Sequence, residues 1–428
     1  MSTTIISKNQ NIFLQEGQKY LIKSQDGHEM VFYVMTTNRL QDEVYVKVVK
    51  PSSLNTGFKL SDIENPEQKN SVEELVDFDE IANYYFKDSP QSVRKKIGKL
   101  LYQNPNHPIC IVKNQIYNFF DGYDKFEFKN PLVSIENNFD NLLIPKDHPG
   151  RRKTDTFYSE NDSYVLRTHT TAHQTELLKA GIKKFISTGD VYRRDTIDAS
   201  HFPIFHQVEG VNILGNVSDE QVIEHLKDTL SGLIKHLFGN DVKYRFVDEY
   251  FPFTNPSFEV EVEYHGKEME VLGCGVIHKD IMKNCGLEGQ NGWAFGMGLE
   301  RLAMIFFDIP DIRYFWSEDS RFLSQFKEGQ ITKFQPYSKY PPVTRDISMW
   351  VPDNFNDNYF YDIVRDAGNN LVEEVSLGET FVHPKTLKTS KFFHISYRSL
   401  DRTLTGEEID EIQKEIKQKA IESGCEIR

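Results

Sequence analysis

The chain is poor in the residues that define disulfide-stabilised, zinc-ribbon and membrane proteins. It has only 4 cysteines among 428 residues, and none of them forms a CxxC pair. A zinc knuckle and a disulfide framework are therefore not expected, and a reducing compartment is the simplest interpretation. No apolar run approaches the roughly 20 residues that span a bilayer. We expect a globular protein that has no membrane segment.

The chain also lacks an excess of basic charge. Lys and Arg together number 50 against 64 Asp and Glu, which gives a formal net charge of -14. This balance excludes a protein covered in basic surface, although a local basic face can still bind RNA. The first fifteen residues contain one Lys, no Arg and no acid. That composition is at best a weak organelle transit signal, and it equally fits an ordinary terminus.

Three blocks follow one another along the chain, over residues 1–91, 92–333 and 334–428. The first block alternates short β-like runs with polar loops, at Tyr20–Ile22, Val31–Met35 and Val44–Val49. It carries no motif that predicts a function. The second block is dense in aromatic residues, prolines and histidines. The third block is compact and regular.

The third block has the pattern β-α-β-β-α-β. Strands are predicted at 342–351, 372–382 and 392–400, helices at 356–367 and 406–423, and a short strand at the end. The last helix has acids in its first turn and lysines later, as the helix dipole favours. This order is that of the ferredoxin-like fold, which hosts many functions and predicts none by itself.

A first candidate site lies in the segment 189–210, GDVYRRDTIDASHFPIFHQVEG. Strand patterns at 190–194 and 203–211 predict a hairpin that presents Arg193 from a rigid strand. A guanidinium group is a planar, permanently charged fork that can hold a phosphate with two hydrogen bonds. Surface ion pairing is the alternative interpretation for Arg193 and for Arg194.

A second candidate site lies in the segment 292–315, GWAFGMGLERLAMIFFDIPDIRYF. Gly296 and Gly298 allow a ligand to approach the backbone closely. A helix is predicted to begin near Leu299, with Arg301 in its first turn. The spacing is not the dinucleotide-binding GxGxxG, because Arg301 stands where the third glycine belongs. An amphipathic core helix is the alternative, but it does not explain this arginine.

These two segments resemble motifs 2 and 3 of class II aminoacyl-tRNA synthetases. Their wording, YRRDTIDASHFPIFHQVEG with AFGMGLERLAM and IPDIRYF, is similar to that of the single-chain, organellar phenylalanyl-tRNA synthetases. Further stretches at 137–158, 167–178, 250–276 and 334–352 agree with that family. The resemblance covers about 92–428 and leaves out 1–91. It implies an α+β fold: a class II antiparallel sheet flanked by helices, then a ferredoxin-like anticodon-binding domain.

The resemblance implies a phenylalanine–tRNA ligase, which activates phenylalanine with ATP and transfers it to tRNA(Phe). Adenylation needs positioning and charge neutralisation more than a protein acid or base. By resemblance, Arg193 binds the α-phosphate, Arg301 binds the γ-phosphate end, and Glu270 helps to hold Mg²⁺. The alternative for Glu270 is one charged face of a glutamate-rich strand.

The resemblance also implies an amino acid site. Gln207 and Glu209 match the residues that bind the ammonium group, and His169 lies on the neighbouring motif. Phe251 and Phe253 share a face of an extended segment and would flank the substrate ring edge to face. The other residues implied to contact substrates are Thr171, Ala172, His173, Gln174, Ser200, His201, Phe202, Val208, Ala294 and Phe295.

The resemblance implies several properties of the tRNA reaction. No strong general base is evident for transfer to the ribose hydroxyl, which leaves the adenylate phosphate for that role. Nothing between residues 92 and 428 is long enough for an editing module, so we expect none. The candidate tRNA-binding residues of the last domain are Lys339, Arg345, Lys385, Lys388, Lys391, Arg398 and Arg402.

Other functions remain open at this point. A catalytically inactive RNA-binding or regulatory paralogue is one, and a synthetase for another amino acid is a second. A zinc hydrolase is a third, but His169 is followed by Thr170 where HExxH needs Glu. The resemblance implies a monomer in the mitochondrial matrix, with a cytoplasmic location as the alternative.

Overall fold

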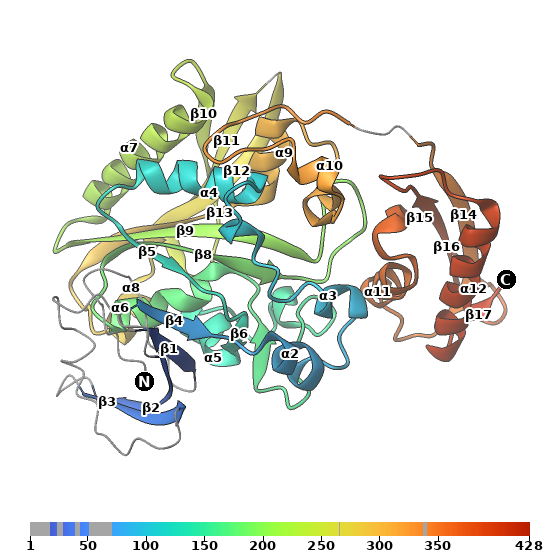
Figure 1. Ribbon diagram of the computed structural model, residues 1–428, viewed down its shortest axis with the longest axis horizontal. Helices are drawn as coiled ribbons and strands as arrows, with labels where there is room; N and C mark the ends of the chain where they lie inside the picture. The colour runs from blue at the N-terminus through green and yellow to red at the C-terminus, as the bar shows by residue number, and fades with distance from the viewer. Residues whose placement is uncertain (1–17, 24–28, 39–42, 51–70, 265, 337–339) are drawn as a thin grey trace.

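The computed structural model describes residues 18–23, 29–38, 43–50, 71–264, 266–336 and 340–428, and Figure 1 shows their arrangement. Within these ranges no helix combines the length and the apolar character that crossing a bilayer requires. The first fifteen residues and Lys339, which the sequence analysis singled out, lie outside the described residues.

A seven-stranded sheet forms the centre of the molecule, in the order β10-β11-β12-β13-β9-β8-β5. All neighbouring pairs are antiparallel except β5 and β8. This is the antiparallel sheet that the resemblance implies. Its strands are β5 (Asp124–Glu127), β8 (Lys184–Tyr192), β9 (Ile204–Gly215), β10 (Lys243–Glu249), β11 (Thr254–Tyr264), β12 (Lys267–Ile277) and β13 (Asn291–Gly298).

Three long helices cover one face of this sheet, as Figure 1 shows: α4 (Pro108–Phe119), α7 (Asp219–Phe238) and α9 (Leu299–Phe307). The start of α7 is fixed by a capping box, in which Ser218 and Gln221 each bond the other's backbone N–H. Apolar side chains from these helices and the sheet form the main core. The predicted helix near Leu299 is confirmed as α9. The predicted hairpin is present as β8 and β9, but β8 ends at Tyr192, so the expectation that Arg193 lies on the strand is wrong: Arg193 is the first residue after it.

The second face of the sheet is covered by shorter elements and holds a smaller core. Because these elements are short, they leave part of the face uncovered, and the candidate site lies there. They include β6 (Leu132–Ser134), α5 (Ile135–Asn138), β7 (Tyr164–Leu166), α6 (Gln174–Lys179) and α8 (Lys279–Asn284). Three further short helices are α2 (Phe78–Glu80), α3 (Gln91–Arg94) and α10 (Ser320–Leu323).

The N-terminal block forms a separate four-stranded sheet in the order β3-β2-β1-β4. The three β-like runs seen in the sequence lie inside its strands. Their bounds are β1 (Lys19–Lys23), β2 (Glu29–Asn38), β3 (Glu43–Lys50) and β4 (Ser71–Leu75).

The C-terminal block has the predicted β-α-β-β-α-β order and forms a sheet in the order β15-β16-β14-β17. Strand β16 begins at Thr389, earlier than the predicted 392. Pairing of Ser390 with Trp350 of β14 and with Phe381 of β15 extends the strand into the polar turn. The elements are β14 (Val343–Val351), α11 (Asp357–Gly368), β15 (Val372–Val382), β16 (Thr389–Tyr397), α12 (Gly406–Glu422) and β17 (Glu426–Ile427).

The C-terminal domain packs against the loop that joins β8 to β9. The Arg365 guanidinium of α11 donates to the carbonyl oxygens of Asp195 and Thr196, the latter at 2.6 Å. Ile197 forms a β-bridge with Val375 of β15. The loop that carries part of the candidate site is therefore anchored by another domain.

Candidate active site

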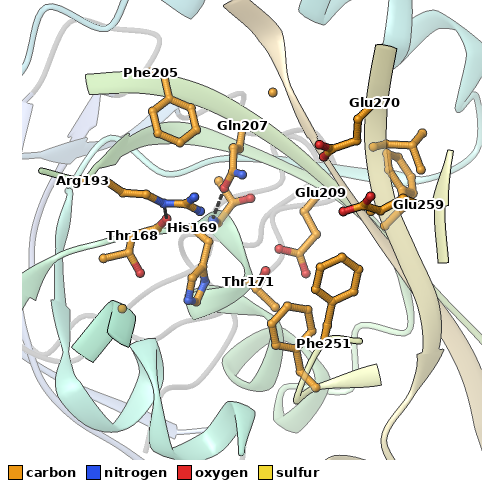
Figure 2. Close-up of a pocket in the computed structure, with 18 of the residues that line it drawn as sticks. Thr168, His169, Thr171, Arg193, Phe205, Gln207, Glu209, Phe251, Glu259 and Glu270 are labelled. Carbon is orange, nitrogen blue, oxygen red and sulfur yellow. Dashed lines mark hydrogen bonds between the residues drawn. The ribbon is translucent and has the colours of Figure 1, made fainter. Parts of the chain in front are cut away.

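A cavity of ≈ 760 Å³ opens on the second face of the central sheet. Its wall is built by β9, β11, β12, β13, the start of α9, the β8–β9 loop and the segment before β11. Figure 2 shows side chains from these separate stretches converging on one space. Both Arg193 and Arg301 contribute to this wall.

Alternation along β9 decides which residues face the cavity. Phe205, Gln207 and Glu209 line it, because side chains two apart on a strand share a face. His206 and Val208 point to the opposite face, and Val208 is fully buried in the main core. Val208 therefore supplies packing behind the site, and Phe205 takes a place on the wall that the sequence analysis did not assign.

Two glycines of β13 leave the space above the sheet free. Gly296 pairs with Glu209 and Gly298 pairs with Gln207 across the β13–β9 ladder. A Cβ atom at either glycine would meet nothing within 4 Å. The sheet floor is thus bare backbone at these positions, which allows a flat ligand to lie close to it.

Arg193 follows directly after β8 and is held from two sides. Its Nε donates to the carbonyl oxygen of Thr168 at 2.8 Å, and its guanidinium lies over the Phe205 ring at 5.2 Å. Protein atoms surround the group, yet solvent reaches it through the cavity. This crowding lowers the pKa of Arg193, so an anionic ligand would stabilise the charged guanidinium.

Arg301 also borders the cavity, in the first turn of α9. It donates to the backbone oxygen of Glu270 at 2.8 Å, and its distance to the Glu270 carboxylate is 3.6 Å. The two side chains are about half exposed, at 55% and 49%. An exposed pair of this length contributes little to stability and can exchange for a ligand.

Glu259 of β11 stands beside Glu270, and the sequence analysis did not single it out. Both carboxylates line the cavity and lie close together in Figure 2. Burial, and then the charge of Glu270, raise the pKa of Glu259. Two carboxylates that repel one another across a cavity are suited to a hard cation with oxygen ligands. The residues present therefore fit Mg²⁺.

Glu209 is the most deeply buried acid of the cavity, with 2% of its surface exposed. Neither carboxylate oxygen has a well-formed hydrogen bond to the part of the chain that the structure describes. Burial raises the pKa of Glu209 to about 8, although the hydroxyl groups of Thr171 and Thr170 oppose the shift. Figure 2 shows the carboxyl group between Thr171 and Phe251. A buried carboxyl group whose hydrogen bonds are not well formed is suited to an ammonium group brought by a ligand.

His169 and Gln207 lie beside Glu209. Burial, and then the charge of Arg193, lower the pKa of His169 to about 3, so its imidazole is neutral. Both of its ring nitrogens lack a well-formed hydrogen bond. The Gln207 side-chain oxygen accepts from Thr170 N–H at 3.3 Å, which leaves the amide NH₂ group available. These polar groups therefore remain available for hydrogen bonds to a ligand.

Phe251 and Phe253 form an apolar wall next to Glu209. Their rings are nearly parallel, with centroids 5.8 Å apart and an interplanar angle of 8°. Gly273 of β12 is required here, because a Cβ atom would lie 2.8 Å from the Phe251 ring. The two rings share a face of the cavity, as the sequence analysis predicted.

The β8–β9 loop brings Ser200, His201 and Phe202 to the cavity wall. Phe202 stacks on Trp316 at 5.5 Å, which fixes the end of the loop. Asp198, which the sequence analysis did not assign, accepts hydrogen bonds from the backbone N–H groups of Ser200 and His201. This aspartate gives the loop its turn.

Some predicted residues lie behind the cavity, and others border it while their side chains pack in the core. The His173 ring stacks on Phe128 at 3.7 Å and contacts Arg167 at 3.0 Å, in a buried polar network. The Phe295 ring stacks on Phe120 at 5.4 Å on the core face of β13, although the residue borders the cavity. Ala294 borders the cavity, whereas Ala172 and Gln174 are buried and are not on its wall.

The zinc-hydrolase alternative finds no support. Within the described ranges, no three or more His, Cys, Asp or Glu side chains form a group that could hold a metal ion. His169 and His173 are four residues apart in sequence, but only His169 borders the cavity.

Family models match two parts of the chain. Residues 94–326 match the model described as the tRNA synthetases class II core domain (F), and residues 338–428 match the ferredoxin-fold anticodon binding domain. The predicted fold class, a class II core followed by a ferredoxin-like domain, is confirmed.

Full-length relatives agree with the domain matches. The chain is 48% identical over 342 residues to the chloroplastic/mitochondrial phenylalanine–tRNA ligase of Arabidopsis thaliana, covering 77% of this chain and 79% of that one. It is 42% identical to the mitochondrial phenylalanine–tRNA ligase of Mus musculus, covering 78% and 83%. It is 33% identical to the mitochondrial phenylalanine–tRNA ligase of Saccharomyces cerevisiae, covering 82% and 95%. With two arginines, an unpartnered buried glutamate and a pair of phenylalanines around one cavity, the chain belongs to the phenylalanine–tRNA ligase family of class II synthetases.

Proposed function

We propose that this chain activates phenylalanine with ATP and transfers the phenylalanyl group to tRNA(Phe). The observation that carries the proposal is the convergence of Arg193 and Arg301, from separate stretches of chain, on one cavity that also holds Glu209. A triphosphate and an ammonium group need opposite charges held a short distance apart. This cavity supplies both.

The inner end of the cavity is suited to phenylalanine. The ammonium group would pair with Glu209 and donate a hydrogen bond to the Gln207 side-chain oxygen, which has a second lone pair besides the one used by Thr170 N–H. The phenyl ring would lie against Phe251 and Phe253. Aromatic pairs contribute about 0.5–1.5 kcal/mol beyond burial. A tyrosine hydroxyl would be buried without a partner at such a wall, which costs on the order of 1–3 kcal/mol.

The outer part of the cavity is suited to ATP. Arg193 would bind the α-phosphate, where charge develops as the phenylalanine carboxylate attacks and pyrophosphate leaves. Arg301 would bind the far end of the triphosphate. The open floor at Gly296 and Gly298 leaves room for the base.

Glu270, together with Glu259, would hold Mg²⁺. When bound with ATP, the cation would neutralise phosphate charge. The two carboxylates would keep it on the side of the cavity nearest Arg301, and Arg301 would exchange its Glu270 contact for the nucleotide.

The domain boundaries proposed from the sequence are 1–91, 92–333 and 334–428. The first block, whose role is open, precedes the catalytic domain, and the last would bind the anticodon region of tRNA. We propose that the enzyme is a monomer and that the C-terminal domain swings away from the β8–β9 loop when tRNA binds. Identical small-angle scattering curves with and without tRNA would count against this movement.

We place the enzyme in mitochondria, in agreement with the names of its relatives. Microscopy of a tagged full-length chain tests this location, and a cytosolic signal would reject it. The chain offers no segment for editing between 92 and 428, so purified protein should not hydrolyse Tyr-tRNA faster than water does.

The main test is phenylalanine-dependent exchange of pyrophosphate into ATP. Exchange should appear with phenylalanine and be much weaker with tyrosine or leucine. Absence of exchange would favour the alternative, an RNA-binding paralogue that has lost catalysis. Exchange that is strongest with another amino acid would favour a different synthetase.

A further inference from the structure

The mouth of the cavity holds a histidine–aspartate pair to which the proposed mechanism assigns no chemical role. His201 Nδ1 lies 2.6 Å from one Asp198 carboxylate oxygen. The other Asp198 oxygen accepts from the backbone N–H of Ser200 at 2.7 Å and of His201 at 2.9 Å, and from the Ser200 hydroxyl at 2.8 Å. The aspartate is therefore fixed, and it fixes the ring of His201.

The aspartate also determines which tautomer of a neutral His201 ring is favoured. An ionised carboxylate only accepts hydrogen bonds, so Nδ1 carries a proton, and in the neutral imidazole Nε2 then presents a lone pair. Although burial opposes it, hydrogen bonds from Ser200 and His201 hold the pKa of Asp198 below its usual range. A carboxylate that orients an imidazole in this way is the arrangement of a general base with its orienting partner.

His201 and Asp198 lie at the end of the cavity where the second substrate, tRNA, would approach. The His201 side chain is 46% exposed while the residue borders the cavity, whereas Glu209 is 2% exposed. Phenylalanine and ATP fill the interior first, so the tRNA terminus has to approach from the exposed side. A base at the mouth remains accessible at that stage.

The loop that holds the pair is anchored on both sides. Ile312 N–H donates to the carbonyl oxygen of Ala199 at 2.8 Å, and Arg365 of α11 holds the start of the loop. Arg365 also acts electrostatically on Asp198. Other charged residues on the cavity wall include Arg194 and Asp195 at the start of the loop, Arg193 after β8 and Arg301 on α9.

We propose that His201 is the general base of the transfer step and that Asp198 is its positioning residue; the proposal rests on the proposed function. The terminal ribose hydroxyl oxygen attacks the carbonyl carbon of phenylalanyl-adenylate, and its proton passes to His201 Nε2. The bond from that carbon to the phosphate oxygen breaks, and its electron pair leaves with AMP. The imidazolium then releases the proton to solvent.

Chemical rescue tests this role. Enzyme carrying preformed phenylalanyl-adenylate is mixed with saturating tRNA(Phe), and the first turnover is followed. His201→Ala should slow transfer by about 100-fold, and added imidazole should restore part of the rate in proportion to its concentration. His201→Gln, which fills the space of the ring, should show the same loss without rescue. Asp198→Asn should show a smaller loss that imidazole does not restore.

The chain contains a matched control far from the cavity. His394 and Asp346 form a pair of the same kind at 2.5 Å, with side chains 47% and 53% exposed. His394→Ala should leave the rate at saturating tRNA unchanged.

Two results would overturn the proposal. Transfer by His201→Ala at the wild-type rate would assign the proton to the adenylate phosphate. Slow transfer without any response to imidazole would leave His201 as a binding residue only. Pyrophosphate exchange by the wild-type enzyme tests the proposed function separately, because exchange needs no tRNA and no base for the ribose.

Discussion

The charged groups of the catalytic cavity and those of the C-terminal domain differ in how far they are already paired within the protein. In the cavity, the Glu209 carboxylate and the ring nitrogens of His169 are buried without well-formed hydrogen bonds to the described residues, and Arg193 donates through its Nε to the carbonyl oxygen of Thr168. In the C-terminal domain, most of the described basic residues predicted to bind tRNA are already paired. These pairs are Arg345–Asp410, Lys388–Glu426, Lys391–Asp357, Arg398–Glu373 and Arg402–Glu408.

The difference shows what each region has to do. Buried polar groups without partners lower stability, so they persist where a ligand completes them. The paired residues of the C-terminal domain are already satisfied without RNA. They bind phosphate only by exchanging one partner for another, which weakens the contribution of each. Among the described members of that set, Lys385 alone has no ion pair within the described ranges.

The largest effect should come from removing Arg193 of the cavity wall. Arg193→Ala should reduce pyrophosphate exchange by about 10²–10³, because a preorganised donor to the developing phosphate charge is lost. Arg345→Ala, which breaks only an exposed pair in the C-terminal domain, should leave exchange unchanged. A loss below tenfold for Arg193→Ala would remove this arginine from the phosphate site.

The next effect concerns Glu209 and pH. Its pKa of about 8 means that the empty site holds a proton at neutral pH. The phenylalanine ammonium favours the ionised carboxylate, so binding releases that proton below pH 8. Affinity for phenylalanine should therefore rise by up to about tenfold per pH unit from pH 6 to pH 8, and then level off.

Calorimetric titration at several pH values measures this slope and the proton released. Glu209→Gln should bind phenylalanine more weakly and without the slope. A wild-type affinity that stays constant between pH 6 and pH 8 would show that Glu209 is not the ammonium partner.

A smaller effect is expected at the carboxylate pair. Glu270→Gln and Glu259→Gln should each raise the Mg²⁺ concentration for half-maximal exchange by about tenfold, since losing one charged contact costs on the order of 1.5 kcal/mol. Glu263→Gln is the control, because Glu263 lies on the same strand as Glu259 but pairs with Lys243 outside the cavity. An unchanged Mg²⁺ requirement in both cavity variants would place the cation elsewhere.

The smallest effect should separate free from paired lysines in the C-terminal domain. If Lys385 contacts RNA, Lys385→Ala should lower the salt dependence of tRNA binding by about 0.7 in the log–log slope. Lys388→Ala should change it less, because Glu426 already neutralises Lys388. Equal slopes for the two variants would show that an ion pair within the protein does not weaken a lysine's contribution to RNA binding.

Local order along the chain was well predicted from the sequence. The β8–β9 hairpin, the start of α9 at Leu299 and the six elements of the C-terminal domain all follow from hydrophobic periodicity and capping, which act over a few residues. The extension of β16 to Thr389 was not predicted, since its cause is pairing with neighbouring strands.

Within the candidate site, the sequence predicted which residues are present better than it predicted which side chains border the cavity. Phe205 and Glu259 were missed, although alternation along FHQVEG already places Phe205 on the face of Gln207 and Glu209. His173 and Phe295 were assigned to substrates, but the structure places their rings against Phe128 and Phe120. A sequence motif identifies the residue at each position. Which face of its strand borders the cavity depends on where that strand lies in the assembled sheet.

By itself, the sequence determined the family, the order of the elements and the two arginines, because these depend on motif wording and on periodicities of two and 3.6 residues. The tertiary structure alone decided that Glu259 joins Glu270, that Glu209 is buried without a partner, and that Asp198 orients His201. Distances between side chains from separate stretches, and the burial that shifts a pKa, arise only when the sheet and its loops are assembled.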